Sequence, residues 1–225
     1  MAVERRTAAR HGEVRWPAVA AIIVGGVLHT ALPQGLLLQP RWLAPSVEAV
    51  LLVSLIAVNP VRLTTETRWS RIASLALVTV IIVANLVSLT LLIRDLTSSQ
   101  SVGGRGLLLA AFQVWLTNMI AFALVFWELD RGGAVARLPS SGVDTRKADF
   151  LFPQDDPNVA RMETDGQWIP EFVDYLFLSV TNSTAFSPTD TLPLSRRAKV
   201  LMSVEAITAL TISLLVVARA VNVLR

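Results

Sequence analysis

The sequence lacks cysteine and has little charge. Of its 225 residues only 16% are charged, whereas 53% are hydrophobic. Without cysteine, neither a disulfide framework nor a thiolate metal site is possible. The share of charge is also low, because about a quarter of the residues of an ordinary soluble domain carry charge. These deficits exclude small disulfide-rich folds and argue against an ordinary soluble domain.

The motifs of common enzyme classes are missing as well. The sequence contains no HExxH, no glycine-rich phosphate loop and only two histidines, His11 and His29. The net charge of +3 comes from arginines in a tail and in loops, not from a basic run interleaved with aromatic residues. Nucleic acid is therefore not an expected partner. We expect a protein that is not an enzyme and that uses neither a cofactor nor a bound metal.

Charged residues are rare within five long apolar segments and lie mostly between them. A bilayer core about 30 Å thick needs about 20 apolar residues per helix. The segments of that length are residues 16–40, 42–61, 72–93, 106–127 and 200–218. Trp16, Trp42 and Trp69 precede the first three, and Trp127 ends the fourth, where indole rings favour the headgroup level. The pattern predicts an all-α integral membrane protein with about five transmembrane helices in a lipid bilayer.

The chain divides into four regions by composition. We assign residues 1–15 to a charged tail, 16–127 to four transmembrane helices, 128–167 to a polar acidic linker and 168–225 to a last unit. The linker is too short and too poor in apolar residues to hold a core of its own. We expect it to lie on the spans, to pack against other subunits or to be partly disordered.

The last unit begins with a moderately apolar stretch, residues 168–180, that is too short to cross a bilayer. Pro170 and Glu171 suit the first turn of a helix. A hydroxyl-rich run and the fifth span follow. A short helix, an extended polar run and a full span are the pattern of a re-entrant pore loop. The residues that would line this loop are Thr181, Ser183, Thr184, Ser187, Thr189 and Asp190.

This unit resembles the pore module of tetrameric, potassium-channel-like cation channels. Residues 184–190 fall where the filter Thr-Thr-Val-Gly-Tyr-Gly-Asp would fall, and 190–193 are similar to the Asp-x-x-Pro that often follows it. Glu205 and Ala206 match the Glu-Ala that inner helices of this type often carry. The resemblance covers about a quarter of the chain. The chain looks even more similar to an uncharacterised family of bacterial inner-membrane proteins with the same five-span layout. The resemblance implies a homotetramer with a central ion path.

The expected filter departs from the channel pattern. Ser187 and Thr189 replace the two glycines, and Pro188 stands where tyrosine would be. Glycine adopts backbone angles that other residues reach only with strain, and Pro188 restricts both itself and Ser187. We therefore expect no potassium-type filter. A path lined by hydroxyl groups and a ring of Asp190 carboxylates would pass monovalent cations with weak selectivity.

Two acids, Glu48 and Glu205, lie inside predicted spans. Ionisable residues at such depth are costly and by default indicate function. For Glu205 two interpretations stay open: a functional group, or a structural ion pair with Arg196, Arg197 or a neighbouring subunit. For Glu48 the sequence favours structural pairing.

The distribution of arginine predicts the orientation in the membrane. Lysine and arginine mark cytoplasmic loops, and the tail, the second loop and the linker carry most of the arginines. The rule places the N-terminus in the cytoplasm and the protein in the inner membrane. It also places the pore-like loop on the cytoplasmic side, opposite to the filter of the channels that the unit resembles, so the orientation of that loop stays open.

Three functions are compatible with the sequence. The leading one is a channel-like, weakly selective cation pore. The second is a non-conducting membrane scaffold or accessory subunit that uses the same architecture for assembly. The third is a small-solute transporter, which would require broken helices in paired halves. No internal repeat supports the transporter.

Overall fold

The computed structural model describes residues 13–36, 42–58, 68–97, 104–137, 147–163, 168–184 and 190–223. Over these residues the protein is all-α, as predicted. Its helices are α2 (Trp16–Thr30), α3 (Leu43–Val58), α4 (Arg68–Thr97), α5 (Gly104–Leu129), α6 (Pro157–Glu163), α7 (Phe172–Thr184) and α8 (Arg196–Val223). Short 3-10 helices lie at Gln34–Leu36, Asp130–Gly132 and Pro153–Asp155. Strand β1 (Phe150–Leu151) pairs antiparallel with β2 (Leu192–Pro193).

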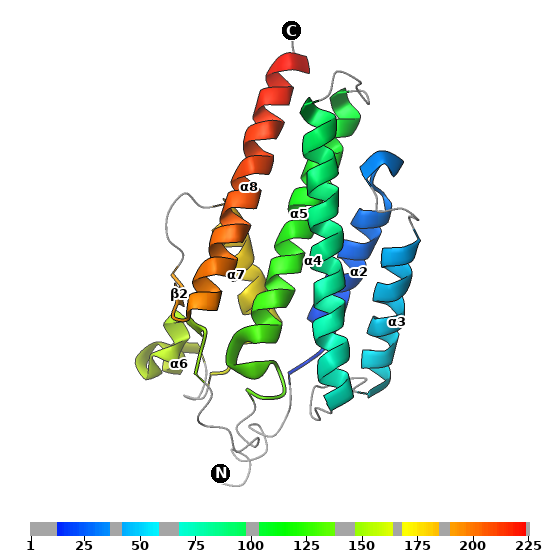
Figure 1. The fold of residues 1–225 in the computed structure, drawn as a ribbon. Helices are drawn as coiled ribbons and strands as arrows, with labels where there is room; N and C mark the ends of the chain where they lie inside the picture. The colour runs from blue at the N-terminus through cyan, green and yellow to red at the C-terminus, as the bar shows by residue number, and fades with distance from the viewer. Residues whose placement is uncertain are drawn as a thin grey trace.

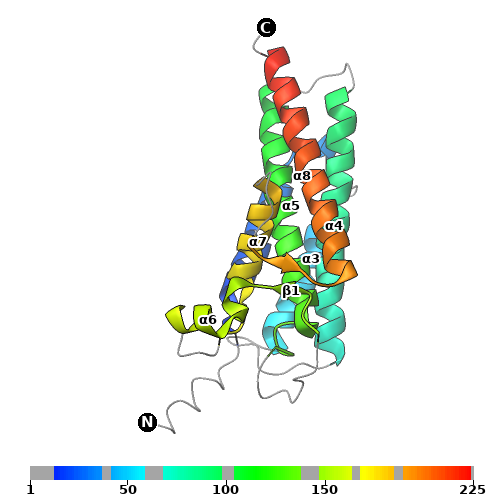
Figure 2. The same cartoon turned by 90° about the vertical axis from the view of Figure 1, so that its left-hand side faces the viewer.

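The long helices lie side by side in one bundle (Figure 1). Helix α5 is central, because it packs against α2, α4, α7 and α8, whereas α3 packs on α4 and α2 at one side (Figures 1 and 2). Much of the buried surface of α5 consists of small side chains, among them Ala110, Ala111, Ala121 and Ala123. Small residues let helices approach closely in a membrane, where packing replaces the hydrophobic effect as the force between helices.

Among the residues that the structure describes, three helices are long and apolar enough to cross a membrane: Arg68–Asp95, Leu108–Gly132 and Arg196–Val217. They correspond to the third, fourth and fifth predicted spans and suggest a multi-pass membrane protein. Helices α2 and α3, in the first and second predicted spans, have 15 and 16 residues. Both are shorter than the roughly 20 residues that a straight crossing needs.

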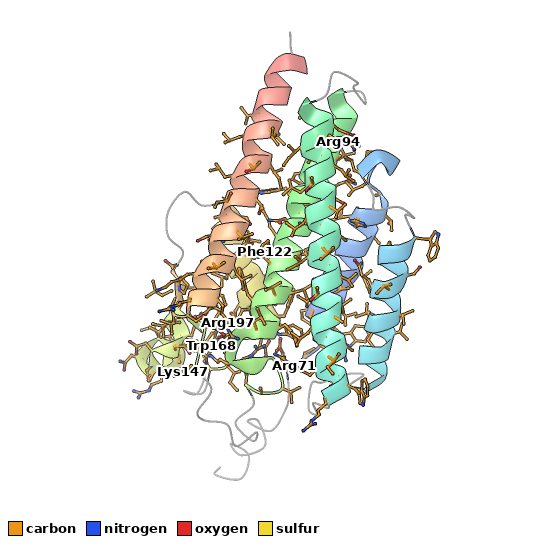
Figure 3. All side chains as sticks on the ribbon, viewed as in Figure 1. Arg71, Arg94, Phe122, Lys147, Trp168 and Arg197 are labelled. Carbon is orange, nitrogen blue, oxygen red and sulfur yellow. The ribbon has the colours of Figure 1, made fainter. Side chains whose placement is uncertain are left out.

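Charged side chains gather at the end of the bundle where α4 and α8 begin and α5 ends, which we call the linker end. Arg71, Lys147 and Arg197 lie there, whereas Arg94 lies at the opposite end (Figure 3). Arg71 donates to Glu128 at 2.6 Å, joining the start of α4 to the end of α5. This asymmetry matches the predicted distribution of arginine between the two sides.

The described part of the linker takes the first of the three expected arrangements, because it packs on the linker end. Phe150 and Phe152 are buried, and their rings lie 6.4 and 5.3 Å from the ring of Tyr175 on α7. Asp149 binds Arg197 at the start of α8. Figure 2 shows α6 and β1 beside this end of the bundle. The linker therefore covers the bases of α7 and α8.

Trp127 is an exception among the tryptophans that flank the spans. Trp16, Trp42 and Trp69 are 55%, 63% and 81% exposed, as an interfacial position requires, but Trp127 is only 8% exposed. Its indole N–H donates to both carboxyl oxygens of Glu13, at 2.9 and 3.0 Å. Trp127 is therefore covered by protein at the end of its span, because the linker and the residues before α2 pack on this end of α5.

The turn after α5 has a left-handed backbone. Arg131, Gly132 and Gly133 have φ angles of 52°, 85° and 101°. At Gly133 this φ angle favours glycine, and a Cβ atom would also lie 2.2 Å from Nη1 of Arg71, which would have to move. The turn places Asp130 in the interior, 0% exposed, where its carboxylate accepts from the Tyr175 hydroxyl at 2.6 Å.

Candidate functional site

Helix α7 starts at the linker end and lies beside the lower part of α5 and α8 (Figures 1 and 2). The Glu171 N–H donates to the Asp174 carboxylate at 2.7 Å, and the Phe172 N–H donates to Glu13 at 2.6 Å. Carboxylates stabilise the positive end of a helix. Together with the bond from Tyr175 to Asp130, these contacts fix the first turn of α7.

The last turn of α7 differs from the sequence prediction. Residues 181–184 were expected to begin the extended polar run, but they are helical. Thr181 and Thr184 donate to helix carbonyls four residues earlier, at 2.9 and 2.7 Å. Because these hydroxyl groups are satisfied within the helix, they do not end it. The predicted start of the extended run at Thr181 is wrong, and no re-entrant loop is shown by the described residues.

The other residues predicted for the loop lie in different places. Ser183 is on α7, facing α8, whereas Ser187 and Thr189 lie outside the described residues. Asp190 is exposed and stands two positions before β2, at the linker end. The structure does not bring Asp190 and Thr184 into a described contact, so the lining role of the six residues stays a prediction.

Glu205 is fully buried between α7 and α8, with 0% of its surface exposed. Three side chains of α7 bind its carboxyl group. Ser183 donates to Oε1 at 3.1 Å, Asn182 donates to Oε2 at 2.6 Å, and Ser179 contacts Oε1. Positions three and four apart share one face of a helix, which is why all three reach the same carboxyl group. We call Glu205, Ser179, Asn182 and Ser183 the Glu205 clamp.

The number of hydroxyl protons in the Glu205 clamp bears on the protonation state of Glu205. The Ser179 hydroxyl has one proton, and two acceptors lie within reach: the Met119 carbonyl at 2.8 Å and the carboxyl group of Glu205. Both contacts are full hydrogen bonds when Glu205 carries a proton and donates it to Ser179 Oγ, while Ser179 donates to Met119. The clamp then joins α8 to α5 through α7 without an ionised group.

The expected ion pair between Glu205 and Arg197 is wrong. Arg197 lies eight residues earlier on α8, about 12 Å along the helix. Its Nε donates to Asp149 at 2.7 Å instead. Arg196 is exposed at the same end. The helical rise separates both arginines from Glu205.

A line of hydrogen bonds continues from the clamp through the bundle. Thr208, one turn after Glu205, accepts from Asn118 Nδ2 at 3.2 Å. Asn85 Nδ2 donates to Asn118 Oδ1 at 2.9 Å, and Thr117 donates to Asn85 Oδ1 at 2.8 Å. These four residues, the polar layer, connect α8, α5 and α4 inside an otherwise apolar interior. Satisfied polar side chains between helices add specificity to packing in membranes.

The polar layer ends at a cavity of about 20 Å³ between α2, α3, α4 and α5, which we call the Glu48 cavity. Its polar lining consists of His29, Glu48, Asn85 and Thr117. Its remaining walls are Ile22, Gly25, Gly26, Ile81, Ala84 and Ile120. Glu48 is 8% exposed. Within the described ranges no basic side chain forms an ion pair with it, so the expected structural pairing of Glu48 is not found there.

Another acid with a buried side chain, Glu13, lies at the linker end outside the spans. Besides Trp127 and Phe172, it contacts Arg137 Nη2 at 3.4 Å. Burial raises the pKa of Glu13 above its ordinary value of 4.5, although Arg137 and the two donors act in the opposite direction. Glu13 connects the chain before α2 to α5 and α7, and it was not identified from the sequence.

The sequence analysis also missed Ser179, Asn182 and Asn118. The spacing of Ser179, Asn182 and Ser183 was a usable signal, because positions i, i+3 and i+4 face the same way once the helix is extended to residue 184. Asn118 had no local signal, since its partners Asn85 and Thr208 are distant in the sequence.

No family model matches the sequence, and no curated protein or solved structure matches the chain. Among the described residues, no three or more acidic or histidine side chains form a group suited to a metal ion. Function is therefore inferred from the sites themselves, since a helical bundle alone does not specify one.

Proposed function

We propose that this is an inner-membrane protein with about five spans in which α7, the segment after it and α8 form a pore unit. In a homotetramer, these units would surround a path for monovalent cations with weak selectivity. The observation that carries the proposal is the short helix α7, which the buried Glu205 clamp holds against α8.

The length and position of α7 support a re-entrant course. Thirteen residues give a helix about 20 Å long, shorter than a bilayer core of about 30 Å. Phe172 binds Glu13 at the linker end, and Leu192 pairs with Leu151 at that same end. The chain therefore enters α7 and begins α8 from one side. Such a course is tolerated in a membrane where protein surrounds the backbone.

The electrostatics of α7 favour a cation. The C-terminal end of a helix carries a partial negative charge from unpaired carbonyl groups. Here the last turn of α7 carries Thr181, Ser183 and Thr184, of which Thr184 is exposed. Polar oxygens and negative helix ends are the groups that attract cations in pores. Asp190, at the linker end, would form a ring of carboxylates at the mouth of the path.

The exposed face of α7 and α8 suits contact between copies. Phe177 on α7 is 63% exposed, and Val200 and Ile207, seven residues apart on α8, are 62% and 65% exposed. Residues spaced in this way form one stripe along a helix. Lipid or a second copy would cover this stripe, and a tetramer would place it near the shared axis.

Ion flux through purified protein in liposomes tests the pore. We expect flux of potassium and sodium that falls in Asp190→Ala, and smaller flux of larger cations. Glu171→Ala is the matched control, because Glu171 is an exposed acid at the start of α7. Equal losses in both variants would contradict the ring of Asp190 carboxylates. No flux from folded, inserted protein would contradict the pore.

One observation favours a non-conducting scaffold as the second candidate. Glu205 and its three donors belong to one chain and satisfy one another, so the clamp needs no ion. A scaffold or accessory subunit would use α7 for packing alone. A monomeric or dimeric mass in detergent, together with the absence of flux, would favour it.

The proposed orientation places the linker end in the cytoplasm. Met162 on α6 is 88% exposed at that end, and the chain has no native cysteine. In intact cells, Met162→Cys should react with a membrane-impermeant thiol reagent only after the membrane is permeabilised. Efficient labelling before permeabilisation would reverse the orientation.

A further inference from the structure

We infer that the Glu48 cavity is a binding site for one small monovalent cation, distinct from the α7–α8 unit. The charge on Glu48 would be balanced there by a proton accompanied by one water molecule, or by a sodium ion. The site lies between α2, α3, α4 and α5, and it does not depend on the proposed pore.

The size of the cavity sets the size of the ligand. A volume of about 20 Å³ is just above the roughly 10–15 Å³ that one water needs. A water molecule or a partly dehydrated sodium ion fits, whereas an organic solute does not. Small polar occupants are also the ones that this lining supports, because Glu48, Asn85 and Thr117, which line the space, carry carboxyl, amide and hydroxyl groups.

The charge of the residues that line the cavity sets the sign of the charge of the ligand. Glu48 and His29 are 8% and 7% exposed, so both side chains are more than nine-tenths buried. Burying an ionised carboxylate is costly unless a proton, a metal ion or a basic group compensates it. The described residues supply no basic ion-pair partner for Glu48. His29 is the other titratable group of the lining, while α4 and α5 contribute Asn85 and Thr117, which do not titrate.

Two adjacent glycines keep the space open. Gly25 and Gly26 lie within α2, although glycine is unfavourable in a helix. A Cβ on Gly26 would lie 3.9 Å from the carboxyl oxygen Oε2 of Glu48, whereas a Cβ on Gly25 would meet Ile120 at 3.5 Å. Both distances are ordinary contacts, so alanine is accommodated at either position. Only at position 26 does the new methyl group occupy space beside the carboxyl group.

The first test is modification of the purified full-length protein by dicyclohexylcarbodiimide, which reacts with protonated carboxyl groups in apolar surroundings. Peptide mass spectrometry measures the adduct on Glu48, in the Glu205→Gln background so that a second buried acid does not compete. Exposed Glu171 is the internal reference. In buffer without sodium we expect Glu48 to react at least about tenfold more than Glu171, equivalent to about 1.4 kcal/mol of preference.

The response of the labelling to sodium distinguishes a bound proton from a bound sodium ion at Glu48. If sodium, but not potassium at the same ionic strength, suppresses labelling and raises the unfolding temperature, the cation is sodium. If labelling is strong and insensitive to sodium, the cation is a proton. Labelling of Glu48 no stronger than that of Glu171, with no shift of the unfolding temperature by sodium, would overturn the inference.

Alanine at each glycine tests the cavity itself. Gly26→Ala should reduce labelling of Glu48, or its protection by sodium, whereas Gly25→Ala should leave both close to wild type. Both variants keep every polar group of the lining, so a folded protein is expected from each. Equal effects of the two substitutions would show that the space beside Glu48 is not the site.

Discussion

Glu205 and Glu48 are both acids within the first three turns of apolar helices, yet their surroundings are opposite. Glu205 is fully buried and receives contacts from three side chains of α7. Glu48 faces a cavity of about 20 Å³ and has no ion-pair partner among the described residues. The comparison separates an acid that stabilises the fold from an acid that has room for a ligand.

The polar layer makes the contrast more informative, because it connects the two regions. Asn118 binds Thr208 near the clamp, and Asn85 both binds Asn118 and lines the Glu48 cavity. A satisfied network of this kind fixes the position of neighbouring helices. A change of charge at Glu48 would therefore act next to Asn85, which is connected by hydrogen bonds through Asn118 to Thr208 on α8.

The largest effect should follow from Glu205→Ala. Asn182 and Ser183 would lose their acceptor inside the bundle, and a buried unpaired donor costs about 1–3 kcal/mol. We expect a loss of about 3 kcal/mol of stability, because two donors are left unpaired while Ser179 keeps its bond to Met119. Thermal unfolding in detergent measures the loss.

Glu205→Gln is the control for that variant. Glutamine keeps the volume and one carbonyl acceptor, and its amide donates to Ser179 as a protonated carboxyl group would. The loss should be about 1 kcal/mol. A loss as large as that of Glu205→Ala would show that the clamp requires an ionised carboxylate.

An intermediate effect is expected for Glu13, whose buried carboxyl group lies 3.4 Å from Arg137. Because burial raises its pKa in the folded protein above 4.5, folding favours the protonated form. The stability that this provides is complete below pH 4.5 and is lost as pH rises through the raised pKa. Glu13→Gln should remove this pH dependence.

Unfolding temperatures of the wild type and Glu13→Gln across a pH series check this prediction. The two curves should diverge as the pH rises, with the wild type falling more steeply. Asp156→Asn is a suitable control, since Asp156 is exposed at the same end. Parallel curves for wild type and Glu13→Gln would contradict the role of burial.

The smallest effect should come from Glu48→Gln. No described donor or basic group depends on this carboxylate, so its replacement by an amide of similar volume should change stability by less than about 0.5 kcal/mol. Thermal unfolding in sodium-free buffer measures it. A loss comparable to that of Glu205→Ala would mean that Glu48 also holds the fold together, and the comparison of the two acids would fail.

The apolar segments could be predicted from the sequence because each helix in a membrane forms its own backbone hydrogen bonds and needs only a run of apolar residues. The three long helices follow from that requirement. The residue at which α7 ends was harder to predict, because Thr181 and Thr184 fit equally well in an extended run or in a helix where their hydroxyl groups donate to backbone carbonyls. Which of the two forms depends on the neighbouring helices.

The environments of Glu205 and Glu48 likewise depend on neighbouring helices and could not be predicted from the sequence. The depth of Glu205 and Glu48 in their segments was visible from the sequence, and it marked both as unusual. Their partners come from other helices: Ser179 is 26 positions from Glu205, and Gly26 is 22 positions from Glu48. Helical periodicity describes one helix at a time and cannot assign contacts between helices.

By itself the sequence determined that this chain is all-α, apolar and suited to a membrane, because local composition decides how each segment meets lipid. It also placed two acids inside that apolar interior. Only the tertiary structure decided that Glu205 is held by α7, that Trp127 is buried on Glu13 and that Glu48 borders a cavity, because packing between helices sets which polar groups find partners.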